Sequence, residues 1–257
     1  MRRSDENWRI DSAMLYLRNL PKLLFNRDPC VIRSRGLEFV LRPRTLDILI
    51  VKEILLNKMY ASRFDKPPLT ADVVVDLGAN FGAFAVWAHS LLKPKRLVLV
   101  EPCEHNIKIL KMNARHSGFA DLAEIVPAAI YKKNGTVGFN SRPRIPANSS
   151  IQEGARREVT ALTFRELLEK HCIKVIDYLK IDIEGGEKFI FIEENRELFA
   201  HRVRYAIMEI HGKHMRIEDA LHYFYRLGFE SRQWAPKEWM PHIWMLEARN
   251  PKLWQPR

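Results

Sequence analysis

Residues 73–82 read VVVDLGANFG, an apolar run that passes directly into a turn containing two glycines. Three consecutive valines are typical of a strand buried on both faces, as in parallel sheets. Gly78 and Gly82 let the backbone turn tightly and approach a ligand with no side chain between them. The apolar residues from Phe81 to Leu92 follow at once, and their composition predicts a buried helix. The segment therefore predicts a strand, a ligand-binding turn and a helix.

The same alternation of apolar strand and helix continues along the chain. Further strands are predicted at 97–100, 125–130, 178–183 and 205–210, and helices at 105–116, 164–171, 187–199 and 217–227. A hairpin turn is predicted at Asn134-Gly135 and a surface loop at 141–157. Two last strands, 230–234 and 243–248, have no helix between them and predict an antiparallel hairpin at one edge. Right-handed crossovers favour an α/β fold with a doubly wound, mostly parallel sheet of seven strands.

Residues 1–70 precede this alternation and predict a helix and hairpin extension to a domain of residues 71–257. The spacing of apolar residues favours an amphipathic helix over 8–25, a hairpin over 30–42 and an apolar helix over 45–56. No apolar run approaches the roughly 20 residues that a membrane span needs. We therefore expect a soluble, cytoplasmic protein.

The net charge of +11 is concentrated at the two ends, since residues 1–70 carry +6 and residues 201–257 carry +4. A basic surface of this kind suits an acidic partner or peripheral contact with an anionic membrane. A well-solvated basic exterior without a partner is the alternative interpretation.

Two carboxylates frame the glycine turn. Glu101 ends the second strand, where a carboxylate can accept both hydroxyls of a ribose. Asp76 stands before a Gly-x-x-x-Gly turn, which differs from the Gly-x-Gly-x-x-Gly of dinucleotide sites. A carboxylate at this position repels a pyrophosphate and attracts an ammonium group. The pattern therefore fits a cofactor with a ribose and an amino-acid tail, namely S-adenosylmethionine.

A second concentration of acidic residues follows the fourth strand, where residues 177–187 read DYLKIDIEGGE. Asp182 and Glu184 lie on one face by the period of two. The first and fourth strands of a doubly wound sheet flank its switch point, so Asp182 is expected beside the turn at Gly78. The alternative is that these acids cap the helix that follows.

Both motifs resemble those of the FkbM-type methyltransferases. The resemblance rests on residues 76–82, Glu101-Pro102, Asn113, Ala129, 180–187 and 207–211. It implies a class I S-adenosylmethionine-dependent fold of the Rossmann-like type and O-methylation of hydroxyls on sugars, glycolipids or polyketides. The cofactor-binding residues that we expect are Asp76, Gly78, Asn80 and Gly82 at the methionine part, Glu101 at the ribose, Ala129 at the adenine, and also Asp182 and Glu184.

Transfer of a methyl group to a hydroxyl requires that the hydroxyl lose its proton. Asp182, Glu209 and His211 are the candidate catalytic residues, because each falls at or near the end of a strand. An imidazole titrates near neutral pH, which suits a base, although His211 can equally be a hydrogen-bonded structural residue. Glu209, His211 and His214 do not have a recognised metal-ligand spacing, so no metal is expected.

The expected acceptor is a hydroxyl of a carbohydrate or a glycolipid. Trp234, Trp239, Trp244 and Trp254 can stack on sugar rings, although packing in the core is the commoner use of tryptophan. One alternative is an RNA-directed methyltransferase or RNA-binding module. Neither Asn-Pro-Pro-Tyr nor Asp-Pro-Pro-Tyr occurs, so nucleic acid is not the expected partner. The other alternative is a catalytically silent scaffold that binds S-adenosylmethionine.

Overall fold

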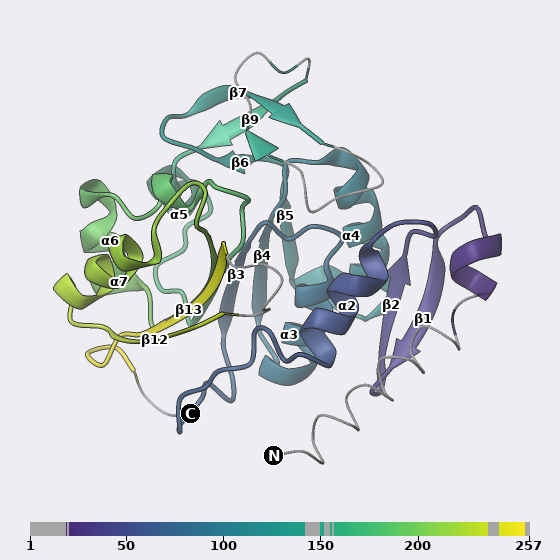
Figure 1. Ribbon diagram of the computed structural model, residues 1–257, viewed down its shortest axis with the longest axis horizontal. Helices are drawn as coiled ribbons and strands as arrows, with labels where there is room; N and C mark the ends of the chain where they lie inside the picture. Colours follow the sequence, from purple (N-terminus) through teal and green to yellow (C-terminus); the bar gives the residue numbers. More distant parts are fainter. Residues whose placement is uncertain are drawn as a thin grey trace.

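A computed structural model describes residue 19 and residues 21–141, 150–151, 155, 157–235 and 242–254. Its centre is a seven-stranded sheet with the order β12-β13-β11-β10-β3-β4-β5 (Figure 1). The strands are β3 (Val73–Leu77), β4 (Arg96–Val100), β5 (Ala123–Val126), β10 (Tyr178–Ile181), β11 (Tyr205–His211), β12 (Glu230–Trp234) and β13 (Ile243–Arg249). β13 runs opposite to the other six strands of this sheet, which confirms the predicted fold class and the hairpin at one edge.

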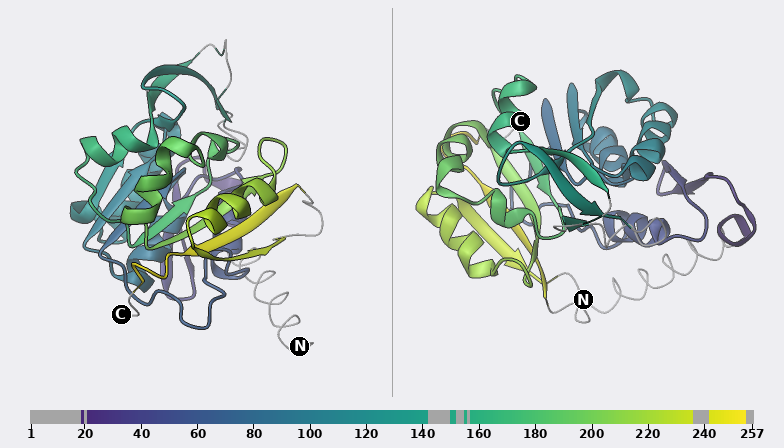
Figure 2. Two further views of the ribbon diagram at one scale, coloured as in Figure 1. Left: turned by 90° about the vertical axis from the view of Figure 1, so that its left-hand side faces the viewer. Right: turned by 90° about the horizontal axis from the view of Figure 1, so that it is seen from above.

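Helices cover both faces of the sheet (Figure 2). The helices are α2 (Asp47–Leu55), α3 (Ala83–Leu92), α4 (Glu104–His116), α5 (Phe164–Lys170), α6 (Arg196–Arg202) and α7 (Ile217–Arg226). Successive residues of β3 point to opposite faces of the sheet. Val74 belongs to the core formed with α2, α3 and α4, whereas Val75 belongs to the core formed with α5, α6 and α7. Burial on both faces explains the continuous apolar strands of the sequence.

The predicted strand 125–130 is wrong as a single element. β5 ends at Val126, and β6 (Ala129–Ile130) belongs to a second sheet with the order β6-β9-β7-β8. This sheet also contains β7 (Gly135–Asn140), β8 (Ser150–Ile151) and β9 (Glu158–Leu162), and it lies at one end of the main sheet (Figure 1).

The hairpin predicted at Asn134-Gly135 is also wrong, because β6 and β7 both pair with β9 and not with each other. The side chain of Asn134 instead accepts a hydrogen bond from the backbone N–H of Thr163, at 2.8 Å. Most of the loop predicted at 141–157 lies outside the described residues, and its described residues 150–151 form β8.

The helix predicted over 187–199 is wrong in its first half. The chain makes two short 3-10 turns, Glu187–Phe189 and Glu193–Asn195, before α6 begins. Ile192, between the two turns, has an extended backbone. The side chain of Glu187 is fully buried and accepts a hydrogen bond from the backbone N–H of Ile183. Contacts to the neighbouring loop therefore replace those of a continuous helix.

The N-terminal extension contains the predicted hairpin, β1 (Cys30–Ser34) and β2 (Leu37–Leu41), followed by α2. Its apolar residues join the same core as α3 and α4. The side chain of Asn113 on α4 cross-links them, because it accepts from Val40 N–H at 2.7 Å and donates to the carbonyls of Val40 and Phe81. Most of the helix predicted over 8–25 lies outside the described residues.

Among the described parts of the chain, no helix has both the length and the apolar character required to cross a membrane.

Candidate active site

A cavity of about 920 Å³ opens at the carboxyl ends of β3, β4, β10 and β11. Strand ends in this position are the usual ligand site of an open α/β sheet. The predicted site residues that line the cavity are Gly78, Asn80, Glu101, Ala129, Asp182, Glu184, Glu209 and His211. Asp76 and Gly82 do not line it. The fold therefore brings together two motifs that are about 100 residues apart in the sequence.

The glycine turn is packed directly against the loop that follows β10. Gly78 has a left-handed backbone with φ 85°, and a Cβ atom built on it would lie 1.8 Å from the backbone oxygen of Asp182. The backbone N–H of Asp182 donates to the carbonyl of Leu77 at 3.0 Å. No side chain fits at position 78, so the turn needs glycine there to pack against the loop after β10.

Glu101 is held in place by three donors. Its carboxylate accepts from the backbone N–H groups of Asn80, at 2.9 Å, and Cys103, at 2.8 Å, and from the amide of Asn106, at 3.2 Å. Burial raises the pKa of Glu101 above its ordinary value, and these hydrogen bonds oppose the rise. Oε2 accepts only one of the three bonds, so it keeps acceptor capacity for a ligand hydroxyl.

The N-terminal extension stabilises the position of the Glu101 carboxylate through Asn106. The guanidinium of Arg42 donates to the side-chain oxygen of Asn106 at 2.8 Å. The same guanidinium forms an ion pair with Asp47, whose side chain is fully buried. Asn106 therefore connects Glu101 to the hairpin and α2, and the extension helps to position the predicted ribose-binding residue.

Asp76 has a cationic partner inside the protein. Lys180 is its register partner on the neighbouring strand β10, and Lys180 Nζ lies 3.0 Å from Asp76 Oδ1. Burial raises the pKa of Asp76, and the Lys180 charge opposes the rise. The prediction that Asp76 contacts the cofactor's ammonium group stays a prediction, because the structure assigns its carboxylate to Lys180.

Lys180 was not among the residues expected at the site, although the sequence carries a signal for it. It alternates with Asp182 along one strand, so both side chains lie on the same face. Lys180 Nζ donates to the carbonyl of Gly78 at 2.7 Å and lies 3.8 Å from Asp182 Oδ2. The hydroxyl of Tyr60 donates to Asp182 Oδ2 at 3.1 Å. Tyr60 lies 122 residues before Asp182 in the sequence, and no local sequence pattern predicts this contact.

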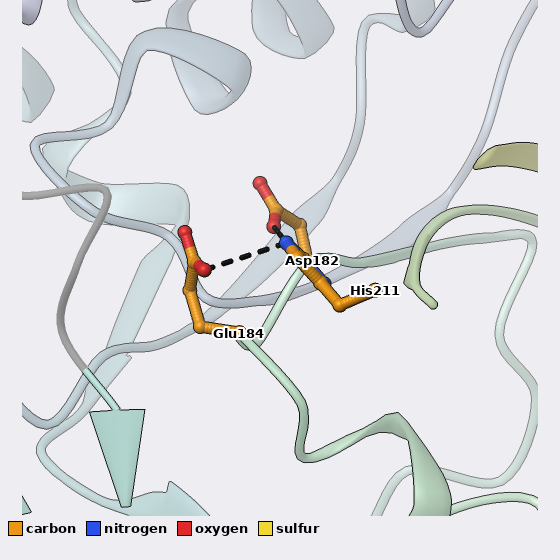
Figure 3. Close-up of side chains that lie close together, drawn as sticks. All are labelled: Asp182, Glu184 and His211. Carbon is orange, nitrogen blue, oxygen red and sulfur yellow. Dashed lines mark ion pairs between the residues drawn. The ribbon is translucent and has the colours of Figure 1, made fainter. Parts of the chain in front are cut away.

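Four carboxylates surround His211. Nδ1 lies 3.0 Å from Glu187 Oε1, and Nε2 lies 3.4 Å from Glu184 Oε2, 3.7 Å from Glu209 Oε2 and 4.0 Å from Asp182 Oδ1. Figure 3 shows Asp182 and Glu184 on the Nε2 side of the ring. Glu187 also lay outside the predicted set, because its place in a predicted helix hid its burial.

The contacts between His211 and these carboxylates shift the pKa values of the residues involved. Burial lowers the pKa of His211, but the hydrogen bond and charge of Glu187 outweigh it and raise the pKa to about 10. Burial, followed by the charge of Asp182, raises the pKa of both Glu184 and Glu209. As long as no cation compensates these carboxylates, their charge favours a proton on His211, and its role as the base stays a prediction.

Three of the four C-terminal tryptophans are described by the structure, and these do not line the cavity. Trp234 and Trp254 pack against the core of α2, α3 and α4, and Trp244 packs against the opposite core. None of these three lines the cavity, and Trp239 lies outside the described residues. The packing interpretation therefore holds for Trp234, Trp244 and Trp254.

The residues of the cavity fit S-adenosylmethionine. Its wall combines the bare backbone at Gly78, the carboxylate of Glu101 and the apolar run of Ala128, Ala129 and Ile130. Bare backbone, a fixed carboxylate and an apolar surface suit the methionine part, the ribose and the adenine, respectively. Glu101 and Ala129 would hold the nucleoside, and Gly78 and Asn80 the part nearer the sulfonium.

The match to a protein-family model agrees with this assignment. Residues 76–231, well over half of the chain, match the model of the methyltransferase FkbM domain. Similar solved structures include M. jannaschii TYW2 in complex with AdoMet, at 12% identity, with 88% of each chain covered and a TM-score of 0.45. The human methyltransferase 10 domain containing protein is 11% identical, with 95% of this chain and 96% of that chain covered and a TM-score of 0.47. No curated protein matches the chain. On the family match and the geometry of the cavity, the chain belongs to the FkbM methyltransferase family and is an S-adenosylmethionine-dependent methyltransferase.

Proposed function

We propose that this methyltransferase acts on a hydroxyl oxygen of a carbohydrate or a glycolipid. The observation that carries the proposal is that one cavity is lined both by the glycine turn and by Asp182, Glu184 and Glu209. Carboxylates accept hydrogen bonds from hydroxyl groups, and a sugar presents several of these on neighbouring carbons. The site is therefore suited to hold a polyol beside the cofactor.

The wall formed by α2 and the residues before it favours an acceptor with an apolar part. Leu46, Leu49, Ile50 and Ile54 line the same cavity. Leu46 and Leu49 remain 39% and 37% exposed, which is unusual for large apolar side chains at a polar site. An alkyl chain attached to the sugar would cover them, so a glycolipid fits this wall better than a free sugar does.

The chain's own residues can orient the hydroxyl and accept its proton. The bound cofactor supplies an electrophilic methyl carbon on a sulfonium, which leaves as a neutral thioether when the hydroxyl oxygen attacks. Asp182, fixed by Tyr60 and Lys180, orients the hydroxyl. Glu209 accepts the proton, because its carboxylate lines the cavity and burial raises its pKa to about 8, close to the pH at which the base must work. Holding the reactants at attack distance lowers the barrier by about 7–11 kcal/mol.

Methyl transfer from labelled S-adenosylmethionine tests the acceptor class. We would offer octyl glycosides of glucose, galactose and mannose, the matching free sugars, a glycolipid extract and transfer RNA. We expect labelled octyl glycosides or glycolipids, each heavier by one methylene, and weaker labelling of the free sugars. Label confined to transfer RNA would contradict the proposal and favour the RNA-directed alternative.

The variant Glu209→Gln tests the assignment of the base. We expect it to lower kcat by about 10²-fold or more while the affinity for S-adenosylmethionine stays within a factor of two. Glu124→Gln is the matched control, because Glu124 also pairs with a histidine, His171, but lies outside the cavity.

A further inference from the structure

Three side chains beside the cofactor turn have the arrangement of metal ligands. Asp182, Glu184 and His211 each offer one ligand atom, and these atoms all lie within 4.8 Å of one another. His211 Nε2 lies 3.4 Å from Glu184 Oε2 and 4.0 Å from Asp182 Oδ1 (Figure 3). Ligands on bonds of about 2.1 Å are separated by about 3 Å at right angles, so small side-chain movements would bring all three onto one cation.

The other nitrogen of His211 is already oriented for this role. Nδ1 lies 3.0 Å from Glu187 Oε1, and Glu187 is fully buried. A carboxylate that accepts from one ring nitrogen fixes the tautomer whose second nitrogen is free to bind a metal. Glu187 therefore positions Nε2 toward Asp182 and Glu184.

A fourth carboxylate, that of Glu209, faces the same space without a hydrogen-bond donor among the described residues. Glu209 is only 9% exposed, and none of the described residues donates a hydrogen bond to its carboxylate. Its Oε2 lies 3.7 Å from His211 Nε2, so it faces the same space from the adjacent strand β11. A buried carboxylate without a donor is costly unless a cation or a solvent molecule compensates it.

The charges around His211 also favour binding of a cation. Around His211 stand the carboxylates of Asp182, Glu184, Glu187 and Glu209. Of these four, Asp182 pairs with a lysine, Lys180, and Lys180 also pairs with Asp76. When the four carboxylates are deprotonated, their negative charge exceeds what Lys180 and His211 compensate, and a divalent cation would neutralise the excess.

We propose that Asp182, Glu184 and His211 bind a divalent cation, Mg²⁺ or Mn²⁺, and that this cation holds the acceptor hydroxyl. The two carboxylates suit these ions, and three protein ligands leave positions open for substrate oxygen. The proposal that the ion binds does not depend on the proposed function, whereas its role toward the hydroxyl rests on that function.

The ion would act as a Lewis acid on the acceptor. The hydroxyl oxygen binds it through one lone pair and uses another to form the O–C bond while the C–S bond breaks toward sulfur. The hydroxyl proton passes to the carboxylate of Glu209. This set of residues differs from the Glu209, His211 and His214 considered in the sequence, because Asp182 and Glu184 take the places of Glu209 and His214.

Titration of the EDTA-treated, dialysed full chain with MnCl₂ tests the site directly, with loss of the free Mn²⁺ signal in electron paramagnetic resonance as the readout. We expect one equivalent to bind with a Kd below about 100 μM. Glu184→Gln should weaken binding tenfold or more, and Asp182→Asn should do the same, with thermal melting showing that both variants fold. Glu124→Gln, beside His171 outside the cavity, should bind as the wild type does.

Absence of saturable Mn²⁺ binding at millimolar concentrations, or unchanged binding by the folded Glu184→Gln variant, would overturn the proposal. Methyl transfer to octyl glycosides or glycolipids, measured with and without EDTA, separates the two claims. Transfer that persists in EDTA, without Mn²⁺ binding, refutes the metal site and leaves the proposed function standing. Mn²⁺ binding with label confined to transfer RNA supports the site and refutes the proposed function.

Discussion

Gly78 and Asp182 are in such close contact that a Cβ atom on the glycine would lie 1.8 Å from the aspartate's backbone oxygen. The contact joins the turn after β3 to the loop after β10. It places the cofactor turn and the acidic group in fixed positions relative to each other, so their relative placement depends on the absence of a single side chain.

Gly78→Ala should therefore abolish binding of S-adenosylmethionine, because the new methyl group must displace either the turn or the loop at Asp182. Isothermal titration measures the binding, and thermal melting measures the stability. Gly118→Ala is the control, since Gly118 also has a positive φ, 74°, but faces open space. It should lose only the roughly 1–2 kcal/mol of a left-handed backbone and keep its cofactor affinity. Equal losses in the two variants would refute the importance of the contact.

Glu101→Gln should weaken binding of S-adenosylmethionine tenfold or more, equivalent to about 1.4 kcal/mol. The amide offers one acceptor oxygen where the carboxylate offers two, and its NH₂ group faces donors such as the N–H of Asn80. Isothermal titration checks this, with Glu104→Gln as the control because Glu104 pairs with Lys108 on the surface. Unchanged affinity in Glu101→Gln would remove Glu101 from the cofactor site.

Asp76→Asn distinguishes two roles of this carboxylate. We expect the free energy of unfolding to fall by about 3 kcal/mol, because Lys180 loses the partner at 3.0 Å that compensates its buried charge. Urea unfolding of the cofactor-free protein measures this loss. If stability is unchanged and only cofactor affinity falls, Asp76 acts on the cofactor's ammonium group and not on Lys180.

Peripheral membrane contact is testable through charge. The triple variant Arg2→Glu, Arg3→Glu and Arg9→Glu should reduce flotation with phosphatidylserine vesicles at least tenfold, because each basic residue near such a surface contributes about 1 kcal/mol. Wild-type flotation should decrease as salt is added.

The control triple variant has the same change in net charge at exposed lysines elsewhere, Lys132→Glu, Lys133→Glu and Lys174→Glu. It should float as the wild type does. Equal loss in both triple variants would show a general effect of net charge, and no loss in either would contradict membrane contact through the N-terminal segment.

Much of the fold could be predicted because burial on two faces leaves a strong local pattern. Val73–Leu77 and Tyr205–His211 are strands buried on both sides, and their runs of apolar residues identify them without tertiary information. The predictions that were wrong concern segments whose secondary structure depends on a partner distant in sequence. Ala129 and Ile130 continue an apolar run, yet they pair with β9 in a second sheet. Glu187 belongs to a helical pattern, yet burial against His211 holds it in a short turn.

The order of residues in the chain was enough to identify the glycine turn, the acid after the second strand and the acidic motif after the fourth, because each depends on neighbours in sequence. The pairing of Asp76 with Lys180, the support of Asp182 by Tyr60 and the meeting of His211 with four carboxylates depend on strand register and loop packing. Such contacts join residues up to 122 positions apart, and local preferences carry no information about them. The cofactor could therefore be predicted from the sequence, whereas the charge balance and the candidate metal ligands emerged only from the tertiary structure.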